Sequence, residues 1–96
     1  MNLQTFKASL GKSAPPADLS QALQGLWWDA KGDWARAHEC AQTQDDADGA
    51  WVHAYLHRRE GDADNAGYWY ARADRMPAAV PLAAEWEAIA QTLLQA

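Results

Sequence analysis

Several residue types are scarce in this chain of 96 residues, and each shortage excludes a class of protein. A single cysteine, Cys40, permits no intrachain disulfide, so we expect a reducing, cytoplasmic setting. No apolar run approaches the roughly 18 residues that a membrane-spanning helix requires. The first ten residues also lack the charged start and apolar stretch of a secretory signal peptide. With two valines, one isoleucine and three threonines, the chain has little material for β-strands.

Basic residues are also few, with 8 Lys and Arg against 13 Asp and Glu, and the formal net charge is −5. A protein of this charge repels phosphate backbones, so we expect no nucleic-acid partner and no membrane partner. The sequence has no GxSxG, no glycine-rich phosphate loop and no CxxC. We therefore expect no nucleotide or redox cofactor.

Apolar residues recur at three- and four-residue spacing, which predicts an all-α protein. An N-terminal segment with a proline-containing linker occupies residues 1–17, and residues 18–96 are expected to form one helical domain. Expected N-caps are Asp18, Asp33, Asp46 or Asp48, and Asp62. The expected helices cover residues 19–31, 34–43, 49–60 and 82–94, with another that begins after Asp62.

Six tryptophans stand against one phenylalanine, and they are either core or ligand site. Buried aromatic rings are the largest apolar contribution available to so small a domain. The helical phases place five tryptophans on apolar stripes, one to each main helix: Trp27, Trp34, Trp51, Trp69 and Trp86. Trp28 alone misses these stripes, so we expect it to be partly exposed or covered by the N-terminal segment.

The pair Gly32-Asp33 recurs as Gly61-Asp62, an offset of 29 residues. Each copy has a helix, a Gly-Asp turn and a second helix with an alanine, Ala37 or Ala66, five residues after the glycine. The second helix carries the run NAGYWYARA at residues 65–73. This pattern resembles the tetratricopeptide and Sel1-like repeat, in which two antiparallel helices meet at such a turn.

The resemblance covers residues 19–75 and implies two helical hairpins that bind a protein or peptide. The period of 29 is shorter than the 34 residues of a tetratricopeptide unit, and two copies are fewer than a stable array needs. The N-terminal segment and the C-terminal helix are therefore expected to cap the open ends of the stack. The strings LWWDAKGDWARAH and WVHAYLHRREGD also resemble a family of small helical proteins of uncharacterised function.

His53, His57 and Glu60 share one face of the helix over 49–60, at a spacing that could hold a metal ion. A third imidazole would have to come from His38, whose distance from the pair the spacing does not determine. The alternative interpretation is a solvated polar face, with His38 hydrogen-bonded at the edge of the core. Cys40 lies on an apolar stripe and is expected to be a buried small hydrophobe.

Aromatic and basic residues that miss the core stripes predict a contact surface on this acidic chain. Tyr68 and Arg72 are spaced for a cation–π pair. The full predicted surface is Trp28, Tyr68, Arg72, Arg75, Arg58 and Arg59.

The sequence thus favours a non-enzymatic binding or adaptor module for a protein or peptide. The alternative is a small metal-dependent enzyme that uses His53, His57 and Glu60 with His38. Whether the chain forms a homodimer is left open.

Overall fold

The computed structural model describes residues 1–95, and it confirms the all-α prediction: no strand occurs within that range. The helices are α1 Leu3–Ala8, the short 3-10 helix η1 Ser9–Gly11, α2 Gln21–Ala30, α3 Trp34–Thr43, α4 Ala47–Arg59, α5 Ala63–Arg72 and α6 Leu82–Leu94. No helix among residues 1–95 is long and apolar enough to cross a membrane.

Side-chain caps begin most of these helices, because a short polar side chain satisfies an N–H of the first turn. Asp33, Asp46 and Asp62 cap α3, α4 and α5 as expected. The expectation for α2 is wrong: its cap is Ser20, whose hydroxyl accepts from the N–H of Leu23 at 3.2 Å. The helix therefore begins after Ser20 and not after Asp18.

The turns that end α2 and α4 have the same backbone conformation. Gly32 and Gly61 lie in the left-handed region, with φ of +83° and +86°. In each turn the N–H of the next residue, Asp33 or Asp62, donates to the carbonyl five residues earlier at 2.9 Å. The Gly-Asp pairs that recur at an offset of 29 residues therefore form the same type of turn at the end of α2 and of α4.

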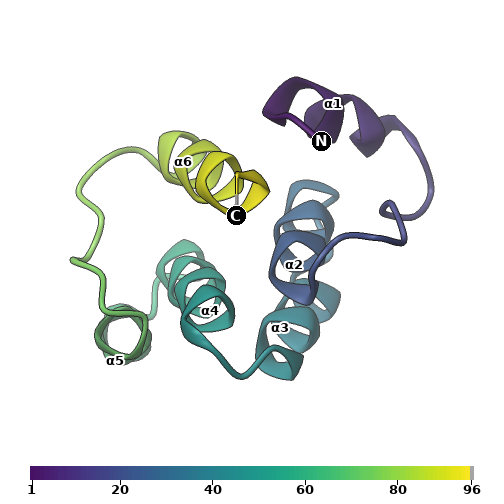
Figure 1. Cartoon of the computed structure of the whole chain (residues 1–96). Coiled ribbons are helices and arrows are strands. Elements are labelled where there is room, and N and C mark those ends of the chain that lie inside the picture. The colour runs from purple at the N-terminus through teal and green to yellow at the C-terminus, as the bar shows by residue number, and fades with distance from the viewer. Residues whose placement is uncertain (96) are drawn as a thin grey trace.

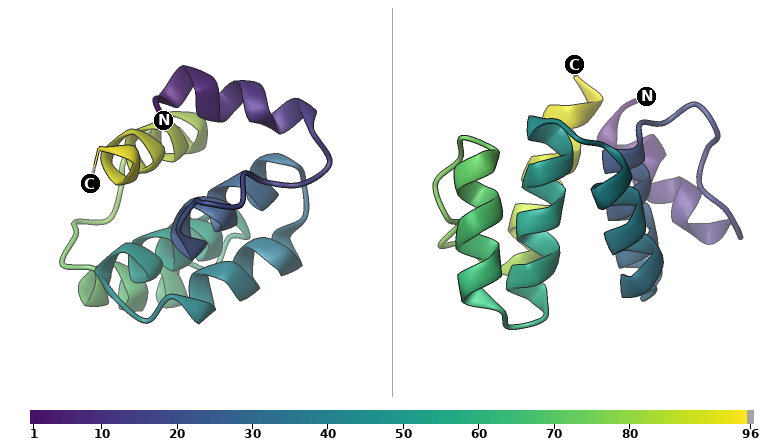
Figure 2. Two further views of the ribbon diagram at one scale, coloured as in Figure 1. Left: turned by 45° about the vertical axis from the view of Figure 1, so that its right-hand side comes forward. Right: turned by 90° about the horizontal axis from the view of Figure 1, so that it is seen from below.

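Two helical pairs, α2 with α3 and α4 with α5, pack side by side, and α4 also contacts α3 (Figure 1). The helix α6 lies across α2 and α4, and α1 packs on α6 (Figures 1 and 2). Phe6 stacks on Trp86 with ring centroids 5.6 Å apart, and the Trp86 indole donates to the Leu26 carbonyl at 2.9 Å. These two segments were expected to cap the ends of the stack. They cover its side instead, because α6 packs on the first helix of each pair, α2 and α4, and α1 packs on α6.

Small residues allow α2 and α3 to pack closely, as the repeat pattern predicted for Ala37. Ala37 is fully buried, and a Cβ on Gly25 would lie only 3.1 Å from its carbonyl oxygen. Ala66, in the corresponding place on α5, is 4% exposed.

The tryptophans divide differently from the sequence prediction. Trp27, Trp51 and Trp86 are buried, but Trp34 and Trp69 are only partly buried at the edge of the core. Trp28 is also partly buried and meets Trp27 edge-on, with ring centroids 4.9 Å apart. The prediction of a core position is therefore wrong for Trp34 and Trp69, and both rings instead lie against histidines.

Candidate metal centre

Three imidazoles from two helices meet on the side of α4 that faces α3. Each of His38, His53 and His57 offers one ring nitrogen, and these nitrogens all lie within 4.8 Å of one another. The Nε2 atoms of His38 and His53 are 2.8 Å apart. The structure thus supplies the distance between His38 and the pair on α4 that the sequence left undetermined.

The prediction of a solvated polar face on α4 is wrong for its two histidines, whereas Glu60 at the end of the helix is exposed as expected. His53 is 3% exposed and His57 is 9% exposed. The reason is the central position of α4. Four helices, α2, α3, α5 and α6, pack on it and bury all residues from 49 to 57. Along residues 49–57 the polar side chains of the helix are therefore enclosed together with the apolar ones.

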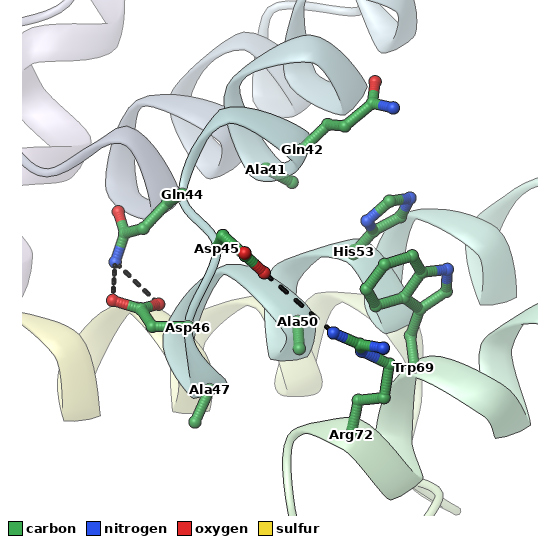
Figure 3. A pocket seen from close by; sticks show the side chains of 10 residues that line it. All are labelled: Ala41, Gln42, Gln44, Asp45, Asp46, Ala47, Ala50, His53, Trp69 and Arg72. Atoms are coloured by element: carbon green, nitrogen blue, oxygen red, sulfur yellow. Dashed lines mark hydrogen bonds and ion pairs between the residues drawn. The ribbon is translucent and has the colours of Figure 1, made fainter.

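Two indole rings enclose the histidines. Trp34 of α3 stacks on His38 with centroids 4.8 Å apart and planes 17° from parallel. Trp69 of α5 stacks on His53 at 3.8 Å and 14°, as Figure 3 shows. The Trp34 indole donates to the carbonyl of Leu56 at 3.1 Å, which fixes its ring. Both imidazoles are therefore held in defined planes, and His53 is also shielded from water.

Glu60 orients the third imidazole. Its Oε1 lies 2.6 Å from Nδ1 of His57, three residues earlier on the same helix. A histidine that donates from Nδ1 to a carboxylate keeps a free lone pair on Nε2, which is the usual outer-sphere support of a metal-binding histidine. Glu60 was predicted as a direct metal ligand, but the structure places it as a hydrogen-bond partner of the candidate ligand His57.

Asp62 also lies near His57, but its carboxylate caps the helix α5. Its carboxylate accepts from both the backbone N–H and the side-chain amide of Asn65, at 3.2 and 2.7 Å, where it caps α5. These hydrogen bonds lower the pKa of Asp62. Asp62 therefore belongs to the cap of α5, while His57 and Glu60 pair with each other.

The environment keeps two of the imidazoles neutral. Burial, with further contributions from His38 and His57, lowers the pKa of His53 to about 4. Burial and the charge on His57 also lower the pKa of His38, against an opposing effect of Glu60. Neutral imidazole is the form that coordinates a metal, so both groups are available as ligands at pH 7.

Part of the predicted contact surface comes together on α5. Nη1 of Arg72 donates to the Tyr68 hydroxyl at 3.1 Å, and the guanidinium lies 5.7 Å from the Tyr68 ring and 5.2 Å from the Trp69 ring. Tyr68 is 54% exposed. Arg75 lies over the ring of Trp51 at 3.7 Å.

The other predicted surface residues lie elsewhere. Arg58 donates to Glu85 of α6 at 2.7 Å, and Nε of Arg59 is 3.2 Å from Oδ1 of Asp29 on α2. Trp28 is covered by the guanidinium of Arg36 at 4.5 Å. The predicted surface is therefore divided: Tyr68 and Arg72 pair on α5, whereas Arg58, Arg59 and Trp28 contact residues of α6, α2 and α3.

Cys40, expected in the core, is only partly buried. Burial and the neighbouring Glu39 raise the pKa of its thiol, so the group stays protonated at pH 7 and is a poor nucleophile. Two buried carboxylates escaped the sequence analysis altogether. Asp29 and Glu85 are each 3% exposed, and their burial depends on partners 15 or more residues away along the chain.

Comparison with family models, curated proteins and solved structures finds no match to this chain. The similarity to tetratricopeptide and Sel1-like repeats stays a prediction.

Proposed function

We propose that this protein binds one transition-metal ion, with Zn²⁺ as the best fit, through the imidazoles of His38, His53 and His57. The observation that carries the proposal is the convergence of three ring nitrogens, from two helices of different hairpins, within 4.8 Å. Two of these imidazoles are neutral at pH 7, and neutral imidazole suits zinc, copper and nickel.

The geometry needs little adjustment to hold such an ion. Zinc–nitrogen bonds of about 2.0–2.1 Å in a tetrahedral site place ligand nitrogens roughly 3.3 Å apart. His38 and His53 would separate by about 0.5 Å from their present 2.8 Å, replacing the hydrogen bond that joins them. The ring nitrogen of His57 lies within 4.8 Å of the other two and would have to move closer by up to about 1.5 Å.

Three protein ligands leave a fourth position for water, the arrangement of catalytic zinc sites. The alternative of a small metal-dependent enzyme is therefore an extension of the same proposal. A zinc-bound water would supply a hydroxide near neutral pH.

The test is a calorimetric titration of tag-free protein with Zn²⁺, together with Co²⁺, whose visible spectrum reports tetrahedral coordination. We expect a single site and a marked rise in melting temperature that a chelator reverses. His53→Gln should abolish binding, and Glu60→Gln should weaken it about 10- to 100-fold.

Cys40→Ser is the matched control, because it removes a metal-binding group on the same helix as His38 while leaving the imidazoles in place. It should bind as the unaltered protein does. Wild-type protein that takes up neither ion, and whose stability ignores both metal and chelator, would contradict the proposal.

A second candidate function, binding of a protein or peptide partner in the cytoplasm, draws on the α5 surface. Arg72 borders a cavity of about 200 Å³ that Trp69 and His53 also line (Figure 3). Its ion pair with Asp45 is long, 3.9 Å, and Asp45 is 93% exposed, so an acidic peptide segment could displace it. Self-association to a homodimer would use the same exposed groups.

The test of this second function is the double variant Tyr68→Ala, Arg72→Ala. Helicity and melting temperature should stay nearly unchanged, since both side chains are at least half exposed. Capture of acidic peptides from a library should weaken. A large loss of stability would instead assign Tyr68 and Arg72 a structural role.

A further inference from the structure

A second cavity, of about 310 Å³, opens on the opposite side of α4 from the histidines. Residues of α1, α2, α4 and α6 line it, so it exists only because α1 and α6 fold back over the hairpins. One wall is apolar, with the indole of Trp86 and the side chains of Leu10 and Ala83. The other wall carries the guanidinium of Arg59.

A buried carboxylate holds that guanidinium in place. Asp29 is 3% exposed, Oδ2 accepts from the Tyr55 hydroxyl at 3.1 Å, and Oδ1 is 3.2 Å from Nε of Arg59. Burial raises the pKa of Asp29 while the charge on Arg59 lowers it, and Asp29 in turn raises the pKa of Arg59. A buried carboxylate is costly without such a partner, so Asp29 keeps Arg59 at this wall.

Arg59 faces Asp29 with its Nε atom. Asp29 and, to a smaller extent, the Tyr55 hydroxyl raise the pKa of Arg59, so both groups engage part of the guanidinium, and the side chain is 47% exposed. The adjacent Arg58 differs, since its Nη1 donates to Glu85 and its Nη2 to the carbonyl of Val80. A guanidinium has five N–H donors, so Arg59 keeps donors for a ligand in the cavity that it lines, beyond those engaged by Asp29 and Tyr55.

We propose that this cavity binds a small carboxylic acid with an apolar body, such as an arylalkanoate. The terminal nitrogens of a guanidinium form a planar fork that matches the two oxygens of a carboxylate. The hydrocarbon part of the ligand would lie against Trp86 and Leu10. The volume, near the lower end of the usual range for ligand sites, limits the ligand to about the size of one ring with a short chain.

An ion pair at the rim of the cavity offers a substitution that should strengthen ligand binding. Lys7 of α1 and Glu87 of α6 form an ion pair at 3.3 Å, and each side chain is about half exposed. The Glu87 carboxylate repels a ligand anion and occupies Lys7. Replacing it by the neutral glutamine should therefore strengthen binding of an acid and leave binding of an uncharged analogue unchanged.

The experiment compares 3-phenylpropionate with its amide, 3-phenylpropionamide, by calorimetry and by the NMR signal of the Trp86 indole N–H, all in the presence of a chelator. We expect the acid to bind with a dissociation constant on the order of 1 mM or below, at least tenfold tighter than the amide, and to shift the Trp86 signal. The chelator keeps the outcome independent of the histidine site.

The double variant Asp29→Asn, Arg59→Gln should bind acid and amide equally weakly while it stays folded, because it removes both members of the ion pair together. Glu87→Gln should bind the acid about two- to fivefold more tightly. Equal affinity for acid and amide in the unaltered protein, binding without a shift of the Trp86 signal, or no binding at 10 mM would each overturn the proposal.

Discussion

The imidazoles of His38 and His53 share one hydrogen bond, with Nε2 atoms 2.8 Å apart, although the two residues belong to different hairpins. One ring must donate and the other accept, so at least one of them is neutral. Protonation of both rings would replace this bond by repulsion between two cations. The packing of α3 on α4 should therefore weaken at low pH, where both rings become protonated.

We expect metal-free protein to lose stability as the pH falls from 6.5. The pKa of His53 is about 4 in the folded protein and near 6.5 in the unfolded chain, so the unfolded chain binds more protons in between. The stabilisation is fully present above pH 6.5 and is lost as the pH falls toward 4. By pH 5 this costs about 2 kcal/mol, and His38 acts in the same direction.

Urea denaturation at several pH values in the presence of a chelator measures this slope. His53→Gln should be less stable than the unaltered protein at pH 7 and should show a much shallower fall from pH 6.5 to 5. An equal slope in both proteins would show that other groups cause the acid sensitivity.

Two helical glycines should respond to the same substitution in opposite directions. A Cβ on Gly49 of α4 would lie 1.8 Å from the carbonyl oxygen of Gln44, so Gly49→Ala must displace backbone and should cost more than about 2 kcal/mol. A Cβ on Gly67 of α5 meets nothing within 4 Å, so Gly67→Ala should stabilise by about 0.5–1 kcal/mol through helix propensity. Thermal denaturation of both variants tests the pair, and stabilisation by Gly49→Ala would refute the packing of the 44–49 turn.

The turn after α5 repeats the geometry of the Gly32 turn with a different residue. Asp74 has φ of +57°, and the N–H of Arg75 donates to the carbonyl of Tyr70, five residues earlier, at 3.0 Å. Asp74→Gly should relieve this backbone strain and stabilise the fold by about 0.5–1 kcal/mol, which raises the melting temperature by several degrees.

Gly32→Ala is the matched control for that variant. It places a Cβ in open space at φ of +83°, so backbone strain alone should destabilise it by about 1 kcal/mol. Changes of the same sign in the two variants would contradict the shared turn geometry.

Arg58 and Arg75 should differ sharply in their contribution to stability. Arg58 pairs with Glu85, whose side chain is 4% exposed and which also accepts from the Tyr70 hydroxyl. Arg58→Ala leaves that carboxylate buried without its cation and should cost about 2–4 kcal/mol, loosening α6. Arg75→Ala removes only a cation–π contact with Trp51, worth about 0.5–1 kcal/mol.

Chemical denaturation quantifies the difference between the two arginines, and amide exchange along α6 locates it. Equal costs for Arg58→Ala and Arg75→Ala would show that the Glu85 pair does not hold α6.

The predicted site residues show where sequence patterns stop being informative. The spacing of His53 and His57 correctly places both rings on one helix face, since that depends only on helical periodicity. The approach of His38 depends on how α3 crosses α4, and the pairing of Arg58 with Glu85 depends on where α6 docks, 27 residues later. No local pattern contains these distances.

The sequence by itself determined the all-α class, the approximate helix bounds, three of the aspartate caps and the glycine turns, because periodicity, capping and backbone conformation act within a few residues. Only the tertiary structure decided that the polar arc of α4 is buried, that three histidines meet there, and that Asp29 anchors Arg59 beside a cavity. These contacts join residues 15 or more positions apart. They depend on how whole helices cross and dock. The same apolar stripes are compatible with many such arrangements, so the sequence pattern alone does not determine them.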